Sequence, residues 1–241
     1  MKTWKGKNLT AHILFSGAGV AQQIWVANKN GAVLFDVGDG TLRDILANKL
    51  DYRKIKSIVC THGHFDHIGG LYSLLGYLRM KRRTEPLPIY LPKGCTEPLL
   101  ILNAYIKRYQ KSIPFKITYK EIKPKDIFSI AGVTIKAYKM THCGSVKGPD
   151  GKEMILAPLP ALGYRISYKN ESIAISGDTG TDGDLELLVK DADLAIIEAT
   201  FKNSKSIPKD ALKRVHLSED IARKIGKLAK EHILIHKGRI S

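Results

Sequence analysis

Cysteine is scarce in this chain: only three residues, Cys60, Cys95 and Cys143, occur among 241. Their odd number and wide spacing do not suit a disulfide framework, so the sequence predicts a protein of the reducing cytoplasm. Long apolar runs are missing too, since no stretch approaches the roughly 18 consecutive apolar residues of a membrane span. The N-terminal MKTWKGKNLTAHILF also lacks the apolar core of a signal peptide. We therefore expect no segment that enters a membrane.

Acidic residues are the second deficit. The 23 Asp and Glu residues stand against 39 Lys and Arg, which gives a formal net charge of +16. Such an excess favours polyanionic partners, such as nucleic acid or an anionic membrane surface, without naming one. The length suits one large α/β domain with a sizeable core. Because no repeat and no clean linker interrupts it, we expect residues 1–241 to form a single domain.

Short apolar runs rich in Val and Ile recur along the chain, and each ends in a polar residue of a catalytic type. Runs of four or five apolar residues bounded by turn signals predict buried strands. The polar groups that follow these runs are Asp36, the THGH segment at 61–64, Asp178, Glu198 and His236. When several strands deliver polar residues at their carboxyl ends, those ends can converge on one site.

Helical patterns lie between these strands, and the alternation predicts an α/β fold of sheets flanked by helices. Helices are expected at residues 68–80, 95–111 and 219–229, and further strands at 84–94 and 114–122. Ser218 is the expected N-cap of the last helix. The segment 144–163 contains prolines and glycines and predicts a loop.

The most informative stretch is THGHFDHIGG at 61–70. His62 and His64 are two residues apart, so in an extended segment both side chains point the same way. Asp66 and His67 follow where the loop turns into a helix and can point at a neighbouring position. This arrangement suits two metal ions better than one, and imidazole with carboxylate suits zinc, while manganese and iron are also compatible. The alternative is a set of histidines satisfied by ordinary hydrogen bonds.

Four ligands in one loop cannot complete two coordination shells, so this interpretation predicts further ligands elsewhere. The candidates are His142 in MTHCG, Asp178 in SGDTG and His236 in LIHKG. An aspartate suits a shared position, because its two oxygens can bridge two cations. His216 and Glu198 remain as candidate proton carriers.

The THGHFDH segment resembles the H-x-H-x-D-H signature of the metallo-β-lactamase superfamily, and most of the chain follows that family's order of motifs. The resemblance implies an αββα sandwich of two mixed β-sheets flanked by helices. It assigns one metal ion to His62, His64 and His142, the other to Asp66, His67 and His236, and the bridge to Asp178. Asp36, in LFDVGDG, matches the family's first-motif aspartate, which orients the histidine loop.

Several segments resemble the ribonuclease Z branch of that superfamily: ILFSGAG, LFDVGDGTLRDIL, GYRIS with SGDTG, IIEATF, and VHLSEDIARKIGKLAKEHILIHKGR. This resemblance implies a catalytic pair of Glu198 and His216, and a homodimer. The long arm with which ribonuclease Z grips tRNA does not fit, because only 35 residues separate His142 from Asp178. Ile197 also stands where the family often has His. Arm-less relatives include phosphodiesterases and arylsulfatase-like hydrolases.

The leading hypothesis is a hydrolase with two divalent metal ions, a phosphodiesterase or ribonuclease Z-like nuclease that uses a metal-bridging hydroxide. Asp66 would orient the hydroxide or accept its proton, and His216, paired with Glu198, would protonate the leaving group. The expected substrate is a phosphodiester, with RNA as a candidate. One alternative keeps the fold and the metals but hydrolyses a thioester, lactone or aryl sulfate. Another is a non-catalytic nucleic-acid-binding protein with a structural metal site.

A weaker signal comes from the basic segment RMKRR at 79–83 and the Lys- and Tyr-rich segment 105–125. These could hold a phosphate backbone, with Tyr105, Tyr109, Phe115 and Tyr119 stacking on bases. They could equally form a solvated basic face with the aromatic rings in the core.

Overall fold

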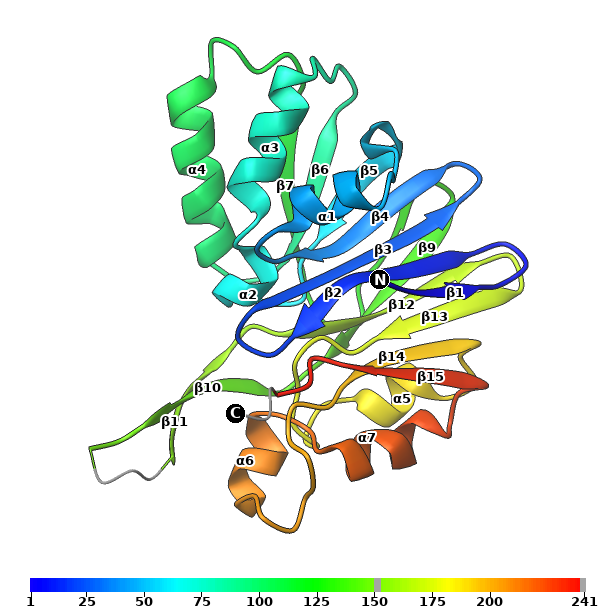
Figure 1. The fold of residues 1–241 in the computed structure, drawn as a ribbon, viewed down its shortest axis with the longest axis vertical. Coiled ribbons are helices and arrows are strands. Elements are labelled where there is room, and N and C mark those ends of the chain that lie inside the picture. Colours follow the sequence, from blue (N-terminus) through cyan, green and yellow to red (C-terminus); the bar gives the residue numbers. More distant parts are fainter. Residues whose placement is uncertain (150–152, 239–241) are drawn as a thin grey trace.

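The computed structural model describes residues 1–149 and 153–238 and contains two large β-sheets that face each other (Figure 1). The first sheet has seven strands in sequential order: β1 (Lys2–Lys5), β2 (Thr10–Gly17), β3 (Ala21–Asn28), β4 (Gly31–Val37), β5 (Ile55–Val59), β6 (Leu87–Pro92) and β7 (Ile117–Ile122). Strands β4 to β7 run parallel, and the connections between them carry the helices α1 (Thr41–Ala47), α2 (Phe65–Ile68), α3 (Leu71–Met80) and α4 (Glu97–Tyr109), besides a short 3-10 turn, η1 (Tyr52–Lys54).

The second sheet has six strands, in the order β15-β14-β13-β12-β9-β8. Its strands are β8 (Ile127–Ile130), β9 (Val133–Lys139), β12 (Leu162–Tyr168), β13 (Glu171–Ile175), β14 (Leu194–Glu198) and β15 (Glu231–Ile235). The helices on this side are α5 (Leu185–Val189), α6 (Lys209–Arg214) and α7 (Glu219–Gly226). Strands β13, β14 and β15 run parallel, so their carboxyl ends lie at one edge.

Three apolar clusters hold these layers together. The largest lies between the sheets and includes Ile24 and Phe35 from the first sheet and Tyr164 and Ile175 from the second. A second cluster joins the first sheet to α3 and α4, and a third joins the second sheet to α5 and α7. The expected αββα sandwich is therefore confirmed.

Helix α3 illustrates how the pattern of residues produces this packing. Four leucines recur at helical spacing and are fully buried against the sheet: Leu71, Leu74, Leu75 and Leu78. The expected strands at 84–94 and 114–122 and the helix at 95–111 correspond to β6, β7 and α4. Ser218 occupies the N-cap position of α7, but its side chain makes no capping hydrogen bond.

The prediction of a loop at 144–163 was wrong. The strands β10 (His142–Lys147) and β11 (Glu153–Leu159) form an antiparallel hairpin that projects from the sandwich (Figure 1). Residues 150–152 of the predicted loop lie outside the described part. A proline within a strand, such as Pro158, is compatible with a two-stranded ribbon because both of its strands have a free edge. Among the described residues, no helix is both long and apolar enough to cross a lipid bilayer.

Candidate metal centre

All seven predicted metal ligands converge where the carboxyl ends of strands from both sheets meet. They come from the β5–α2 loop, α2, the start of β10 and the residues after β13 and β15: His62, His64, Asp66, His67, His142, Asp178 and His236. All of them are buried except His64, which is half-buried. Residues far apart in sequence thus form one dense cluster of imidazole and carboxylate groups.

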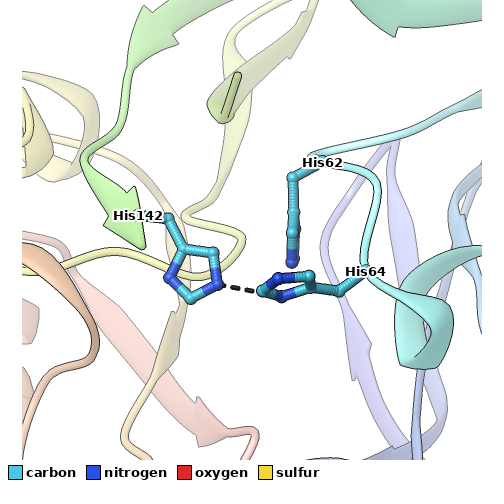
Figure 2. A group of neighbouring side chains, drawn as sticks. All are labelled: His62, His64 and His142. Carbon is cyan, nitrogen blue, oxygen red and sulfur yellow. Dashed lines mark hydrogen bonds between the residues drawn. The ribbon is translucent and has the colours of Figure 1, made fainter. Parts of the chain in front are cut away.

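His62, His64 and His142 form the first of two groups within this cluster (Figure 2). The Nε2 atom of His142 lies 3.1 Å from Nδ1 of His64. The ring centroid of His62 is 4.8 Å from that of each of the other two. The second group contains Asp66, His67 and His236. There the Nε2 atom of His236 lies 3.2 Å from Oδ2 of Asp66 and 3.4 Å from Nε2 of His67.

Asp178 lies between the two groups. Its Oδ2 atom is 3.4 Å from Nε2 of His67 and 3.5 Å from Nε2 of His236, both in the second group. The same oxygen is 3.9 Å from Nε2 of His62 and of His142, both in the first. A single carboxylate oxygen therefore faces ligand atoms of both groups.

The chemistry of this cluster fits divalent metal ions. Nε2 of His62 and Oδ1 of Asp178 are buried and have no hydrogen-bond partner, an arrangement that is costly unless a cation lies beside them. Burial lowers the pKa of His62 well below its usual value, and it lowers that of His142 to about 3. Both imidazoles are then neutral and offer lone pairs, as zinc ligands do. The cluster is consistent with a dinuclear centre.

Asp36 accepts three hydrogen bonds from the segment that contains the histidines. Its Oδ1 atom accepts a 2.7 Å hydrogen bond from the backbone N–H of Thr61, and its Oδ2 atom accepts one of 2.9 Å from the hydroxyl of Thr61. Oδ2 also accepts a 2.7 Å hydrogen bond from Nδ1 of His67. Because Nδ1 is engaged there, Nε2 of His67 faces the cluster.

Three further contacts orient the cluster and were not predicted. Nδ1 of His142 donates to the carbonyl of Val215 at 2.7 Å, and Nδ1 of His236 lies 3.0 Å from the hydroxyl of Thr200. The backbone N–H of Gly19 donates to Oδ2 of Asp66 at 2.9 Å. Gly19 has a φ of 64° and ends the ILFSGAG segment, whose resemblance to ribonuclease Z was the one available signal. The contact with the Val215 carbonyl had no sequence signal, because every residue carries a backbone carbonyl and the sequence does not show which one His142 meets.

Glu198 and His216 are adjacent at the rim of the cluster. Nδ1 of His216 donates to Oε1 of Glu198 at 2.9 Å and lies 3.9 Å from Oδ2 of Asp178. The fully buried carboxylate of Glu198 also accepts hydrogen bonds from the backbone N–H groups of Thr179, Leu217 and Thr200 and from the hydroxyl of Thr200. Burial alone would lower the pKa of His216, but the Glu198 carboxylate outweighs it and raises the pKa to about 9.

The geometry allows His216 to act either as a proton donor or as a metal ligand. Its side chain is 17% exposed, so a group in the site can reach it. A ring nitrogen of His216 also lies within 4.8 Å of ligand atoms of His142 and Asp178, so these three residues could hold a metal ion together. The remaining two histidines of the chain, His12 and His232, belong to none of the side-chain groups that could hold a metal ion.

Part of the aromatic prediction for 105–125 was wrong. Tyr105 is fully buried and Phe115 is 6% exposed, so neither ring can stack on a base. Tyr109 is half-buried and Tyr119 is exposed. The first two rings belong to the core, as the alternative interpretation held.

Comparisons with known proteins agree with this architecture. A family model described as "Beta-lactamase superfamily domain" matches residues 32–236. Ribonuclease Z of Borreliella burgdorferi is 31% identical over 239 residues, which cover 82% of this chain and 73% of the relative. The short form of human tRNase Z superposes with a TM-score of 0.74 at 23% identity, over 95% of this chain and 93% of that one. The metallo-β-lactamase fold protein YhfI of Bacillus subtilis gives 0.72 at 18% identity, over 98% and 88%. At such identities the two structures support the fold alone.

Proposed function

The chain belongs to the metallo-β-lactamase superfamily and is distantly homologous to ribonuclease Z, and on that premise we propose that it is a dinuclear phosphodiesterase acting as a ribonuclease Z-like nuclease. The observation that carries the proposal is the position of Asp178, whose Oδ2 atom faces imidazoles of both groups. We also propose that residues 1–241 act as one hydrolase domain, because both sheets contribute residues to the cluster, and that the protein forms a homodimer, as its resemblance to ribonuclease Z implies.

In this proposal His62, His64 and His142 would hold one ion, and Asp66, His67 and His236 would hold the other, with Asp178 between the two groups. Zinc fits the ligand set best, and manganese or iron would also be accepted. When bound, such ions lower the pKa of water and offset charge on a phosphoryl group. The protein's task is to hold these side chains in a fixed, buried arrangement.

Two groups of this chain are proposed to move protons. Asp66 would orient the attacking water or accept its proton, and its carboxylate is held by the N–H of Gly19. His216 would protonate the leaving oxygen from Nε2, since its Nδ1 is engaged by Glu198. Glu198 positions His216 and does not itself touch the substrate.

A phosphodiester is favoured over neutral esters by the charge of the protein, and over an aryl sulfate by the distant homology to ribonuclease Z. The net charge of +16 attracts anionic substrates, whereas neutral thioesters and lactones gain nothing from it. The Glu198–His216 pair supplies a proton donor, which an alkoxide leaving group needs.

The proposal is tested by assaying zinc-loaded protein against bis(p-nitrophenyl) phosphate, an aryl sulfate, a thioester, a lactone and RNA with a 3′ extension. We expect turnover of the diester and of the RNA. Asp178→Ala should abolish it together with zinc binding, whereas His12→Ala, which lies outside the cluster, should leave both intact. Turnover of only the sulfate, thioester or lactone would overturn the substrate assignment. RNA binding without turnover of any substrate would point to a non-catalytic protein.

A further inference from the structure

Helices α3 and α4 lie side by side (Figure 1), and a dense group of basic residues occurs at and just after their C-terminal ends. The two helices run side by side away from the metal centre, and the basic residues lie in their last turns and in the segments that follow. We define this basic surface by eight residues: Arg79, Lys81, Arg82, Arg83, Lys107, Arg108, Lys111 and Lys116. All are exposed except Arg79 and Arg83, which are half-buried.

Few carboxylates lie near this surface. Residues 71–117 contain two acidic residues, Glu85 and Glu97. Glu85 pairs with Lys56, and Glu97 begins α4 at the opposite end of the helix. Within the described ranges, none of the eight cations takes part in an ion pair with a carboxylate. The carbonyl groups at the helix ends offset part of this charge, and the remainder favours an external polyanion.

Two of the guanidinium groups are fixed by neighbouring groups. Arg79 lies 4.3 Å from the ring centroid of Tyr109 and donates to the hydroxyl of Ser112 at 3.1 Å. Arg83 donates to the backbone carbonyls of Glu85 and Pro86. A fixed planar guanidinium loses little rotational freedom when it binds a phosphate group. Beside them, a cavity of about 230 Å³ is lined by Lys81, Arg82 and Arg83, by Tyr52 and Arg53 of η1, and by one acidic residue, Glu85.

We propose that this basic surface binds the phosphodiester backbone of a nucleic-acid strand whose scissile group lies in the metal centre. The inference rests on the proposed phosphodiesterase function, and it adds a second place, away from the metal centre, at which the substrate contacts the protein. The ten residues of α3 begin four positions after His67, and at about 1.5 Å per residue they span about 15 Å. A stacked strand rises about 3.4 Å per nucleotide, so a substrate must extend about five nucleotides from the scissile bond to reach the surface. Small diesters do not.

A bilayer is a less suitable partner for this surface. Helices that lie on membranes present an apolar face to the lipid, whereas the four leucines of α3 are buried against the sheet. Met80 is the one strongly exposed apolar residue beside the described cations of α3, at 73%. The rings of Tyr105 and Phe115 are buried and cannot stack on bases, so the proposed contact is mainly with phosphates.

Charge reversal tests the proposal. The basic-surface variant carries Lys81→Glu, Lys107→Glu and Lys111→Glu, all at exposed positions. The charge-matched control carries Lys29→Glu, Lys224→Glu and Lys227→Glu, which are equally exposed but lie on the β3–β4 turn and around α7. Binding of a labelled phosphorothioate RNA of about 20 nucleotides, and of the corresponding DNA, is followed by fluorescence anisotropy over a range of salt concentrations.

Each phosphate contact to a single strand contributes about 0.7 to the slope of log K against log salt, so three lost contacts lower the slope by about 2 and weaken binding about 100-fold near 0.1 M salt. The control should bind within about threefold of the wild type. Equal weakening of both triple variants would overturn the proposal, because net charge alone would explain it. Unchanged RNA binding combined with lost binding to phosphatidylserine vesicles would overturn it in favour of a membrane contact.

The small diester keeps this test separate from the proposed function. Bis(p-nitrophenyl) phosphate does not reach the basic surface, so its turnover should be the same in the wild type and in both variants. If the zinc-loaded wild type hydrolyses neither this diester nor the RNA with a 3′ extension, the proposed function fails, while the anisotropy data still decide whether the surface binds nucleic acid.

Discussion

Replacing His216 with alanine distinguishes the two roles that its position allows. As a proton donor, His216 acts through Nε2 while Nδ1 is held 2.9 Å from Glu198. General acid catalysis contributes about 10²- to 10⁴-fold to the rate when the leaving group is a poor one. His216→Ala should therefore lose that factor on a diester with an alkoxide leaving group. It should lose far less on bis(p-nitrophenyl) phosphate, whose leaving group departs without a proton.

The assay measures kcat on both diesters together with zinc content by atomic absorption. We expect His216→Ala to retain the zinc of the wild type, because the proposed ligand set does not include this residue. His12→Ala, a histidine of β2 that contacts Thr3, provides the control. Equal losses on the two diesters would refute the assignment of His216 as an acid, and loss of zinc would make it a ligand.

Glu198→Gln provides a pH-dependent check of the same assignment. The Glu198 carboxylate outweighs the effect of burial and raises the pKa of His216. Activity that requires protonated His216 is lost as the pH rises through that pKa. Removing the negative charge lowers the pKa, so the basic limb of the pH–rate profile should move to lower pH in Glu198→Gln. An unmoved limb would show that another group sets it.

Three further outcomes follow from the structure. Asp36→Asn should lower zinc affinity by about 10- to 100-fold in a chelator competition, because His67 loses the carboxylate that fixes its ring; unchanged affinity would contradict the role of Asp36. Zinc at about 100 times its Kd should add about 2.7 kcal/mol to the free energy of unfolding, so EDTA should lower the Tm in calorimetry, and an unaltered Tm would argue against a metal centre. The thiols of Cys60, Cys95 and Cys143 should not react with Ellman's reagent near about pH 8 until the protein unfolds, because burial raises all three pKa values, that of Cys95 to about 12; rapid labelling of the native protein would refute this.

The clustering of these side chains could be predicted most directly where the residues are close together in the chain. His62, His64, Asp66 and His67 lie within six positions, so their spacing and the preceding apolar run were sufficient. The distant members required a further argument, that strands deliver their polar residues to one edge. That argument succeeds for the residues after β13 and β15 because both strands are parallel to β14 between them.

The hairpin and the orienting backbone contacts were not predictable in the same way. The prolines and glycines at 144–163 indicated a loop. Composition was the only local signal there, because the hairpin strands bury few side chains in the core. Val146, Met154 and Leu156 of the hairpin are exposed, so no core pattern marks its strands. The carbonyl of Val215 reaches His142 only because α6 ends beside β10, and that placement depends on tertiary packing.

Two glycines, Gly38 and Gly70, lie where backbone segments approach each other closely beside the metal centre. A Cβ atom on Gly38, just after β4, would collide with the carbonyl of Asp66, and one on Gly70 would collide with the carbonyl of Gly38. The end of β4 and the start of α3 can therefore approach each other only as glycine backbone. This approach brings Asp36, two residues before Gly38, within 2.7 Å of the His67 ring. Gly38 and Gly70 thus allow the close approach that places Asp36 beside the His67 ring.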